Sequence, residues 1–426
     1  MSRRRKWLLA SAAVVLLIVA AVGAFMAYRL HESRNIVGNS TVQFTSTAAP
    51  PPPPPRVERR QGIVWPTYGY DSERLRNMTS STLKPPYRQV WVWHGQALLE
   101  FPPVVAYGRQ YLTTFDGRFY AIDAKTGKAI FRWDSGRCGW ASPAVDGNTV
   151  YATFIGNHGN CNADVPGSDG ELVAFNAHGR RPRIRWVFHT GPTESSPLVE
   201  NGTVYIGDWL GDVYAIDAKT GKLRWKYQTG GKVKGSVAYS GGIVYVGAYD
   251  GHVYALTARS GKLLWRGSEQ VGLISSGTFY ATPAVDFGRV FIGSTDDKVY
   301  AFGAHTGDLL WSHGTGGYVY ASAAIWHRLV LVGSYDQNFY ALDAATGNVV
   351  WQFHSNGPIS GSATVLGNVV YFSTFNRRTY ALSCATGRLI WSFPDGKYSP
   401  VVADSTHLYL TGYGKLYGMV PRKRRA

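Results

Sequence analysis

The chain has 426 residues, of which 17% are charged and 14% aromatic, so it is long enough to bury a large core. Three cysteines exclude a disulfide-rich scaffold. The formal net charge is +17, and two basic clusters, residues 3–6 and 422–425, carry eight of these charges. A basic surface favours anionic partners such as acidic lipids, cell-wall polymers or nucleic acid, and a merely soluble surface is the alternative interpretation.

An uncharged segment of 22 residues, Trp7–Tyr28, follows the first basic cluster. This length suffices for one helix to cross a bilayer, and the positive-inside bias places residues 1–6 in the cytoplasm. The alternative is a cleaved signal peptide, with Val22-Gly23-Ala24 as the small-residue site. Because a signal core is usually shorter, we expect an uncleaved, single-pass signal anchor over residues 7–28. The remainder of the chain is then outside the cell membrane.

Residues 29–64 lose all periodicity and contain an unbroken proline run, Pro50–Pro55. Such a run forms a semi-rigid spacer of about 3 Å per residue, and recognition by a proline-binding domain is the alternative role. We expect residues 29–64 to be an extracytoplasmic linker.

The rest of the chain is organised around one repeated segment, which reads AIDAKTGKLRW at Ala215–Trp225. A strand end, a tight turn containing glycine and a returning strand follow one another in each copy. The repeated glycines lie at spacings of 52, 42, 40, 46, 40 and 40 residues: Gly127, Gly179, Gly221, Gly261, Gly307, Gly347 and Gly387. A period near forty in strands and turns is typical of a β-propeller built from four-stranded antiparallel blades.

Seven complete strand-turn units can be counted, and an eighth ends after its second and third strands, Leu408–Val420. The missing fourth strand is available as Gln89–Trp93, a tryptophan-bearing strand with no blade before it. Joining the two in one blade closes the ring and removes two open sheet edges. We therefore predict an all-β fold, an eight-bladed propeller over residues 65–421 followed by a basic tail at 422–426. Seven blades is the alternative.

The repeated tryptophan is predicted to dock between neighbouring blades, where burial of one ring removes about 200 Å² from water. Stacking on a cofactor is the alternative role, but the equivalence of the copies favours packing. The five residues concerned are Trp225, Trp265, Trp311, Trp351 and Trp391.

The pattern Ala-x-Asp-x-x-x-Gly-x-x-x-Trp, at Ala215–Trp225 and again at Ala341–Trp351, resembles the tryptophan-docking motif of the pyrroloquinoline-quinone (PQQ)-type propeller superfamily. The resemblance extends from about Trp65 to Val420. It implies a propeller fold, and the superfamily includes both quinoprotein dehydrogenases and BamB-like assembly proteins that work without catalysis.

Quinoprotein dehydrogenases resemble one another in a pair of adjacent cysteines, a calcium ion bound by Glu, Asn and Asp, and a catalytic Asp. No two cysteines are adjacent here. We therefore expect no catalytic residues, no metal and no cofactor, with PQQ and calcium as the alternative.

Three residues before the first strand of each unit, the chemistry changes from blade to blade. Because first strands line the channel of a propeller, we expect these side chains to ring its mouth and to bind a polar ligand or a partner's side chain. A solvent-filled funnel without a ligand is the alternative. The ring residues are Glu100, Trp140, Glu194, Lys234, Tyr280, Tyr320, Ser360 and Lys397.

The hairpin loop of the second unit is unusually long, from Asn157 to Glu171, and contains Cys161, while Cys138 lies just before the same blade. In an oxidising compartment a disulfide between these cysteines is expected. The acidic and amide residues of the loop match no metal-binding spacing.

Together these features predict a membrane-anchored, monomeric propeller that is a non-catalytic scaffolding module. The expected partners are proteins or an anionic envelope polymer, and no nucleic acid is expected. The alternative is a quinone-dependent or sugar- or alcohol-oxidising oxidoreductase that uses the funnel.

Overall fold

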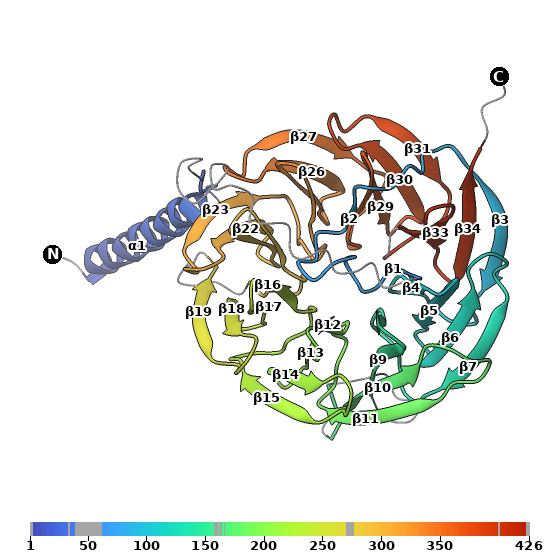
Figure 1. Cartoon of the computed structure of the whole chain (residues 1–426). Coiled ribbons are helices and arrows are strands. Elements are labelled where there is room, and N and C mark those ends of the chain that lie inside the picture. The colour runs from blue at the N-terminus through green and yellow to red at the C-terminus, as the bar shows by residue number, and fades with distance from the viewer. Residues whose placement is uncertain are drawn as a thin grey trace.

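The computed structural model describes residues 3–32, 35–38, 62–156, 161, 164–165, 167–269, 277–398 and 401–422. The propeller contains eight antiparallel blades arranged as a closed ring (Figure 1). This confirms the predicted all-β propeller of eight blades and excludes the seven-bladed alternative.

Each blade runs outward from a short inner strand. Blades one to four comprise β4 (Val104–Ala106), β5 (Arg109–Thr113), β6 (Arg118–Asp123) and β7 (Ala129–Asp134); β8 (Ala144–Asp146), β9 (Thr149–Ile155), β10 (Gly170–Asn176) and β11 (Ile184–Thr190); β12 (Leu198–Glu200), β13 (Thr203–Gly207), β14 (Asp212–Asp217) and β15 (Leu223–Gln228); and β16 (Ala238–Ser240), β17 (Ile243–Gly247), β18 (His252–Thr257) and β19 (Leu263–Ser268).

The remaining blades follow the same order, and the last takes its outer strand from the start of the propeller. Blades five to eight comprise β20 (Ala284–Asp286), β21 (Arg289–Gly293), β22 (Lys298–Gly303) and β23 (Leu309–Gly314); β24 (Ala324–Trp326), β25 (Leu329–Gly333), β26 (Asn338–Asp343) and β27 (Val349–His354); β28 (Thr364–Leu366), β29 (Val369–Thr374), β30 (Arg378–Ser383) and β31 (Leu389–Phe393); and β32 (Val401–Ala403), β33 (Leu408–Thr411), β34 (Lys415–Pro421) and β3 (Tyr87–His94).

The ring closes in the eighth blade, where β3 pairs with β34. Trp91 lies opposite Gly418 and Trp93 opposite Leu416 in this antiparallel ladder. The first and last parts of the propeller therefore share one sheet, and β3 supplies the outer strand that the last blade would otherwise lack.

The repeated tryptophan of one blade packs on the turn of the next. The indole of Trp225 lies against Gly261, so closely that an added Cβ would come within 2.6 Å of the ring. Its Nε1 also donates a hydrogen bond to the carbonyl of Ala258 at 2.8 Å. Trp265, Trp311 and Trp351 make the same contacts with Gly307, Gly347 and Gly387. Trp391 departs from this pattern, since it packs edge-on against Tyr87 of the closing strand.

A segment that precedes the first blade, residues 62–78, closes one end of the channel; we call it the plug. Its strand β1 (Ile63–Trp65) joins blade one and its strand β2 (Asn77–Met78) joins blade seven. Between them, plug carbonyls accept hydrogen bonds from inner-strand amides of blades two, four, five, six and seven: Val145, Tyr239, Val285, Ile325 and Val365. Figure 1 shows the plug, in blue, crossing the middle of the ring.

Arg74 holds the plug in place. Its side chain is fully buried, and its guanidinium donates to the carbonyls of Tyr68, Ser196 and Val237. Burial lowers the pKa of Arg74 to about 9. A buried cation of this kind is tolerated because main-chain oxygens replace the water that it loses.

Helix α1 (Arg3–Glu32) lies outside the ring. In the part of the chain that the structure describes, no helix combines the length and the apolar character needed to cross a membrane. After the helix, residues 35–38 lie along β23: Ile36 and Ser312 form an isolated bridge with amide–carbonyl distances of 3.1 and 3.0 Å, and Gly38 N donates to Thr346 O.

The segment expected to be a linker is therefore bound to the propeller at residues 35–38 and again from residue 62. The reason is that unpaired edge groups of β23 accept a short additional strand. The proline run Pro50–Pro55 lies outside the described residues, as does the basic tail from residue 423 onward.

We predict that Trp311→Ala lowers the free energy of unfolding by about 3–5 kcal/mol, because it removes a fully buried indole and leaves a cavity between two blades. Chemical denaturation measures this loss. Trp7→Ala, at an exposed position of α1, is the control, and an unchanged stability in Trp311→Ala would contradict the inter-blade packing.

A second prediction concerns the plug. Arg74→Met leaves the carbonyls of Tyr68 and Val237 without their buried donor, so we expect a loss of about 3 kcal/mol or more. Arg88→Met, at an exposed position of β3, should change the stability by less than about 0.5 kcal/mol. Equal effects of the two substitutions in denaturant titrations would show that the plug does not depend on Arg74.

Candidate functional site

The channel opens on the face opposite the plug. There a pocket of about 50 Å³ is floored by Tyr68 of the plug and walled by six of the eight predicted ring residues: Glu100, Glu194, Lys234, Tyr280, Tyr320 and Ser360. The other two ring residues lie beside it. Trp140 stacks on Phe115 with centroids 5.4 Å apart, and the Lys397 ammonium lies 4.7 Å from the centroid of Tyr398.

A belt of hydroxyl groups holds the ring residues at fixed positions. Two residues after five of the ring positions, a Ser or Thr accepts a hydrogen bond from the amide of its counterpart in the preceding blade, at 2.9–3.0 Å. The belt consists of Ser196, Ser236, Thr282, Ser322 and Ser362, with Ser142 as its first donor. Tyr68 joins the belt to the plug through a 2.9 Å contact with Ser362. The mouth is therefore built on rigid inner strands.

The charged ring residues are coupled to one another. Lys234 Nζ lies 3.6 Å from Glu194 Oε1 and also 3.6 Å from the centroid of Trp209. Burial raises the pKa of Glu100 and of Glu194 to about 7, against the opposing effect of Lys234, which favours the charged carboxylates. The pocket thus holds two carboxyl groups that change charge near neutral pH.

Aromatic side chains surround the ring, and we call them the aromatic rim. They occupy the same position in the hairpin between the second and third strands of six blades: Phe115, Trp209, Tyr249, Tyr335, Phe375 and Tyr413. Tyr320 connects the ring with the rim, since its centroid lies 5.1 Å from those of Tyr280 and Tyr335. Leu210, Tyr318 and Tyr413 are exposed here by 62%, 48% and 38%.

Neither the hydroxyl belt nor the aromatic rim was predicted from the sequence. Each recurs at the spacing of the repeated glycines, so the same comparison of repeats contained the signal. It was missed because Ser, Thr and aromatic residues next to strand ends are ordinary turn and core residues when one blade is read alone.

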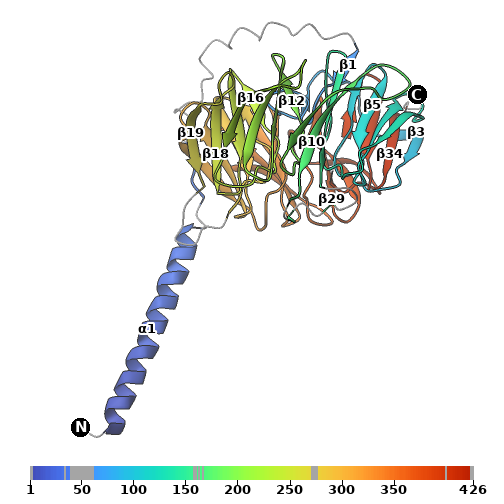
Figure 2. The ribbon, with the colours of Figure 1, turned by 90° about the horizontal axis from the view of Figure 1, so that it is seen from below.

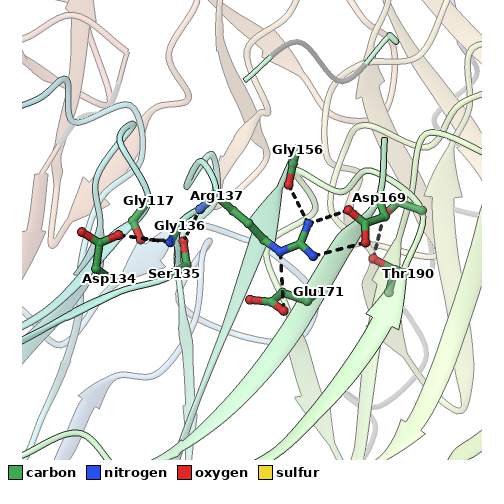
Figure 3. A network of polar contacts seen from close by, with 10 residues as sticks. Gly117, Asp134, Ser135, Gly136, Arg137, Gly156, Asp169, Glu171 and Thr190 are labelled. Atoms are coloured by element: carbon green, nitrogen blue, oxygen red, sulfur yellow. Dashed lines mark hydrogen bonds and ion pairs between the residues drawn. The ribbon is translucent and has the colours of Figure 1, made fainter. Parts of the chain in front are cut away.

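The long loop of blade two lies beside the aromatic rim, where Cys161 packs against the buried cluster of Cys138, Ile155 and Trp209. A disulfide joins Cys138 to Cys161, with Cα atoms 5.6 Å apart. Beside it, Arg137 binds both carboxylate oxygens of Asp169 at 2.6 and 3.2 Å and lies 3.5 Å from Glu171 (Figure 3). Farther along the loop, Asp164 pairs with Lys232 at the entry to blade four. Residues 157–160, 162–163 and 166 lie outside the described residues.

What the mouth can hold follows from its size and polarity. Its pocket is far smaller than the roughly 300–1,000 Å³ typical of small-molecule sites, so it fits a side chain better than a cofactor. Among the described residues, no group of three or more His, Cys, Asp and Glu side chains is placed to hold a metal ion. A larger cavity, of about 420 Å³, lies beside the plug between blades two and three, next to Asp71 and Glu200.

Comparison with known proteins identifies the family. The family model described as outer membrane protein assembly factor BamB matches residues 79–231, 168–317 and 314–423, most of the propeller. The chain belongs to the BamB family. Residues 79–317 are covered by overlapping matches, as expected when one repeat can align with several others.

Solved structures agree on the fold. BamB from Moraxella catarrhalis is 16% identical, with a TM-score of 0.63 over 80% of this chain and 99% of that one. The quinohemoprotein alcohol dehydrogenase of Comamonas testosteroni is 15% identical, with a TM-score of 0.70 over 87% of this chain and 82% of that one. At such identities the likeness concerns the fold alone. The similar structures include both a BamB protein and a quinoprotein dehydrogenase, the two classes named by the sequence resemblance.

A curated relative shares part of the chain. The serine/threonine-protein kinase AfsK of Streptomyces griseus is 34% identical over 146 residues, which are 30% of this chain and 16% of the kinase. The chain therefore spans about a sixth of the length of this relative.

We predict that Glu194→Gln changes the pH dependence of stability. The folded-state pKa of about 7 lies above the ordinary 4.5, so the contribution of this carboxyl is fully present below pH 4.5 and is lost as the pH rises to 7. Relative to the unsubstituted protein, the variant should gain about 2–3 kcal/mol of stability between pH 4.5 and pH 8.

Denaturant titrations across this pH range measure the difference. Asp308→Asn, at an exposed turn far from the mouth, is the control. Parallel pH profiles for Glu194→Gln and the unsubstituted protein would show that the carboxyl is not held in a low-dielectric pocket.

Proposed function

We propose that this protein is a non-catalytic binding module whose channel mouth docks a partner protein. The observation that carries the proposal is the aromatic rim surrounding a central pocket on a rigid hydroxyl belt. Tyr and Trp present large contact areas at low entropic cost, and they are enriched at protein interfaces. Because the ring residues differ from blade to blade, the mouth offers a partner an asymmetric pattern of charge and hydrogen-bonding groups.

We further propose that residues 7–28 anchor the propeller in the cell membrane, with the propeller outside. The absence of charge over 22 residues and the four positive charges before them support this orientation. The disulfide between Cys138 and Cys161 agrees with an oxidising compartment.

The second candidate function is an oxidoreductase reaction with a quinone. Its support is the fold shared with a quinohemoprotein alcohol dehydrogenase and the cavity of about 420 Å³ beside the plug. Against it stands the cysteine spacing, since Cys138, Cys161 and Cys384 are far apart in the sequence.

A capture experiment tests the docking mouth. Detergent-solubilised full-length protein is used as bait for membrane extracts, beside the double variant Trp209→Ala with Tyr320→Ala. The control, Tyr239→Ala with Trp326→Ala, removes two partly buried aromatic residues from the plug face. We expect the mouth variant to capture at least tenfold less partner than the unsubstituted protein, which corresponds to a loss of about 1.4 kcal/mol or more of binding free energy.

Equal capture by the mouth variant and the control variant would overturn the docking proposal. Titration of the same protein with PQQ and calcium, followed by absorbance, tests the second function. A saturable spectral change with dehydrogenase turnover would favour catalysis over docking.

A further inference from the structure

A band of exposed cations lies on the face opposite the mouth. It follows the turns between the third and fourth strands of blades one to four, and we call it the basic crescent. Its members are Lys125, Lys128, Arg180, Arg181, Arg183, Arg185, Lys219, Lys222, Arg259 and Lys262, all of them exposed.

The fold does not require these cations, because the same turn is built without them elsewhere in the ring. In blade six it reads Ala344-Ala345-Thr346-Gly347-Asn348, with the same left-handed glycine at φ 76°. In blade five it contains His305 and Asp308. The turns of blades one to four are therefore basic at this position. Those of blades five to seven together carry one cation, Arg388, and one carboxylate, Asp308, although the backbone repeats.

The carboxylates near the crescent are already engaged. Asp123 Oδ1 accepts hydrogen bonds from the amides of Lys125 and Thr126 at 3.1 and 2.8 Å. Asp217 forms the same turn and pairs with Arg224 at 2.7 Å, and this arginine holds the pKa of Asp217 down at about 2. In blades two and four the aspartate is replaced by Asn176 and Thr257.

The ten cations of the crescent therefore outnumber the carboxylates of the same turns, Asp123 and Asp217. None of the ten forms an ion pair with a residue that the structure describes. Four arginines within six positions, Arg180–Arg185, form its densest part. Clustered, exposed cations of one sign create a local potential that attracts anions.

The backbone beneath the crescent is fixed by the docking tryptophans. Trp186 Nε1 donates to the Ala218 carbonyl at 3.2 Å, and Trp225 Nε1 donates to the Ala258 carbonyl at 2.8 Å. The turns of blades three and four are thus held by the preceding blades. Only the long cationic side chains lose freedom when an anion binds, which limits the entropic cost of binding.

The crescent faces away from helix α1. The turns that carry the crescent are hydrogen-bonded to the turns beside the plug; Ala124 N, for example, donates to Gly108 O at 2.9 Å. The crescent therefore lies on the plug face. Residues 35–38 run antiparallel to β23. The chain coming from α1 therefore contacts the propeller first at Gly314, on the mouth side, and then at Thr346, in a turn on the opposite face. Figure 2 shows α1 leaving from the face opposite β1.

We propose that the basic crescent binds an extended anionic polysaccharide outside the membrane. The cations are spread over four neighbouring turns, which suits a flexible linear polymer with regularly spaced carboxylates or phosphates. This inference rests on the proposed membrane anchor, because with α1 in the bilayer the crescent points away from the lipid surface. The mouth and the crescent would then bind two partners on opposite faces.

Binding of alginate, a polysaccharide of carboxylated sugars, tests the proposal on detergent-solubilised full-length protein. The crescent variant carries Ala at positions 180, 181, 183 and 185. The control variant removes the same number of exposed charges elsewhere, with Ala in place of Lys84, Arg88, Arg388 and Lys415. Thermal unfolding of both variants verifies that they fold.

We expect the crescent variant to bind alginate at least about tenfold more weakly than the unsubstituted protein and the control variant to differ by less than about twofold. The dependence of Kd on salt should also be shallower in the crescent variant, because fewer counterions are released. Equal losses in the two variants, or no alginate binding by the unsubstituted protein, would overturn the proposal.

Two further probes test the class of partner. Crescent-dependent binding of phosphatidylglycerol vesicles, or of a single-stranded oligonucleotide, that is as tight as the binding of alginate would overturn the assignment to a polysaccharide. The capture experiment on the mouth tests the proposed function independently of the crescent. If the crescent variant still captures the mouth partner while the unsubstituted protein binds no alginate, the inference fails and the proposed function stands.

Discussion

The architecture depends on the contact between an indole and the turn of the next blade. In Trp225 the ring covers Gly261 and its Nε1 binds the Ala258 carbonyl, so one side chain supplies both apolar burial and a directed hydrogen bond. The glycine at the turn, at φ 69°, has no Cβ and lets the ring approach within contact distance. Repetition of this contact sets the angle between blades, and the shared sheet of β3 and β34 completes the ring.

Closing the ring creates a channel, and the structure closes one of its ends and leaves the other open. At one end the plug uses its main-chain carbonyls to pair with the amides of the inner strands, and Arg74 satisfies carbonyls that would otherwise be buried without a donor. At the other end the hydroxyl belt holds the ring residues around a small open pocket. A channel that would otherwise run through the disc thus becomes a shallow, one-sided mouth.

The propeller itself could be predicted from the sequence because its information is local and repeated. The turn glycines, the tryptophans and the unpaired strand Gln89–Trp93 were sufficient for the blade number and the closure. The plug could not be predicted in this way, since residues 62–78 have no periodicity and pair with strands that are distant in sequence. The pairing of Ile36 with β23 could not be predicted either, because a bridge between two residues has no sequence signature.

The candidate site was predicted only in part. Six ring residues line the pocket because the segment that leads into each inner strand borders the channel. Trp140 and Lys397 instead pack on neighbouring aromatic rings. Whether a side chain lies in a pocket or beside it depends on packing between blades, and a single repeat does not contain that information.

A repeat protein provides an internal comparison that a single-copy fold lacks. Positions that remain constant around the ring, such as the docking indoles and the belt hydroxyls, are explained by packing and pairing between blades. Positions that change while the backbone stays the same are free of that requirement, so their chemistry reflects something outside the fold. By this criterion two regions stand apart, the mouth, where Glu194, Lys234 and Tyr280 occupy equivalent places, and the turns, where Arg259 in blade four corresponds to Ala345 in blade six. They lie on opposite faces, so a partner bound at one leaves the other accessible, which is the arrangement that a scaffold between two partners requires.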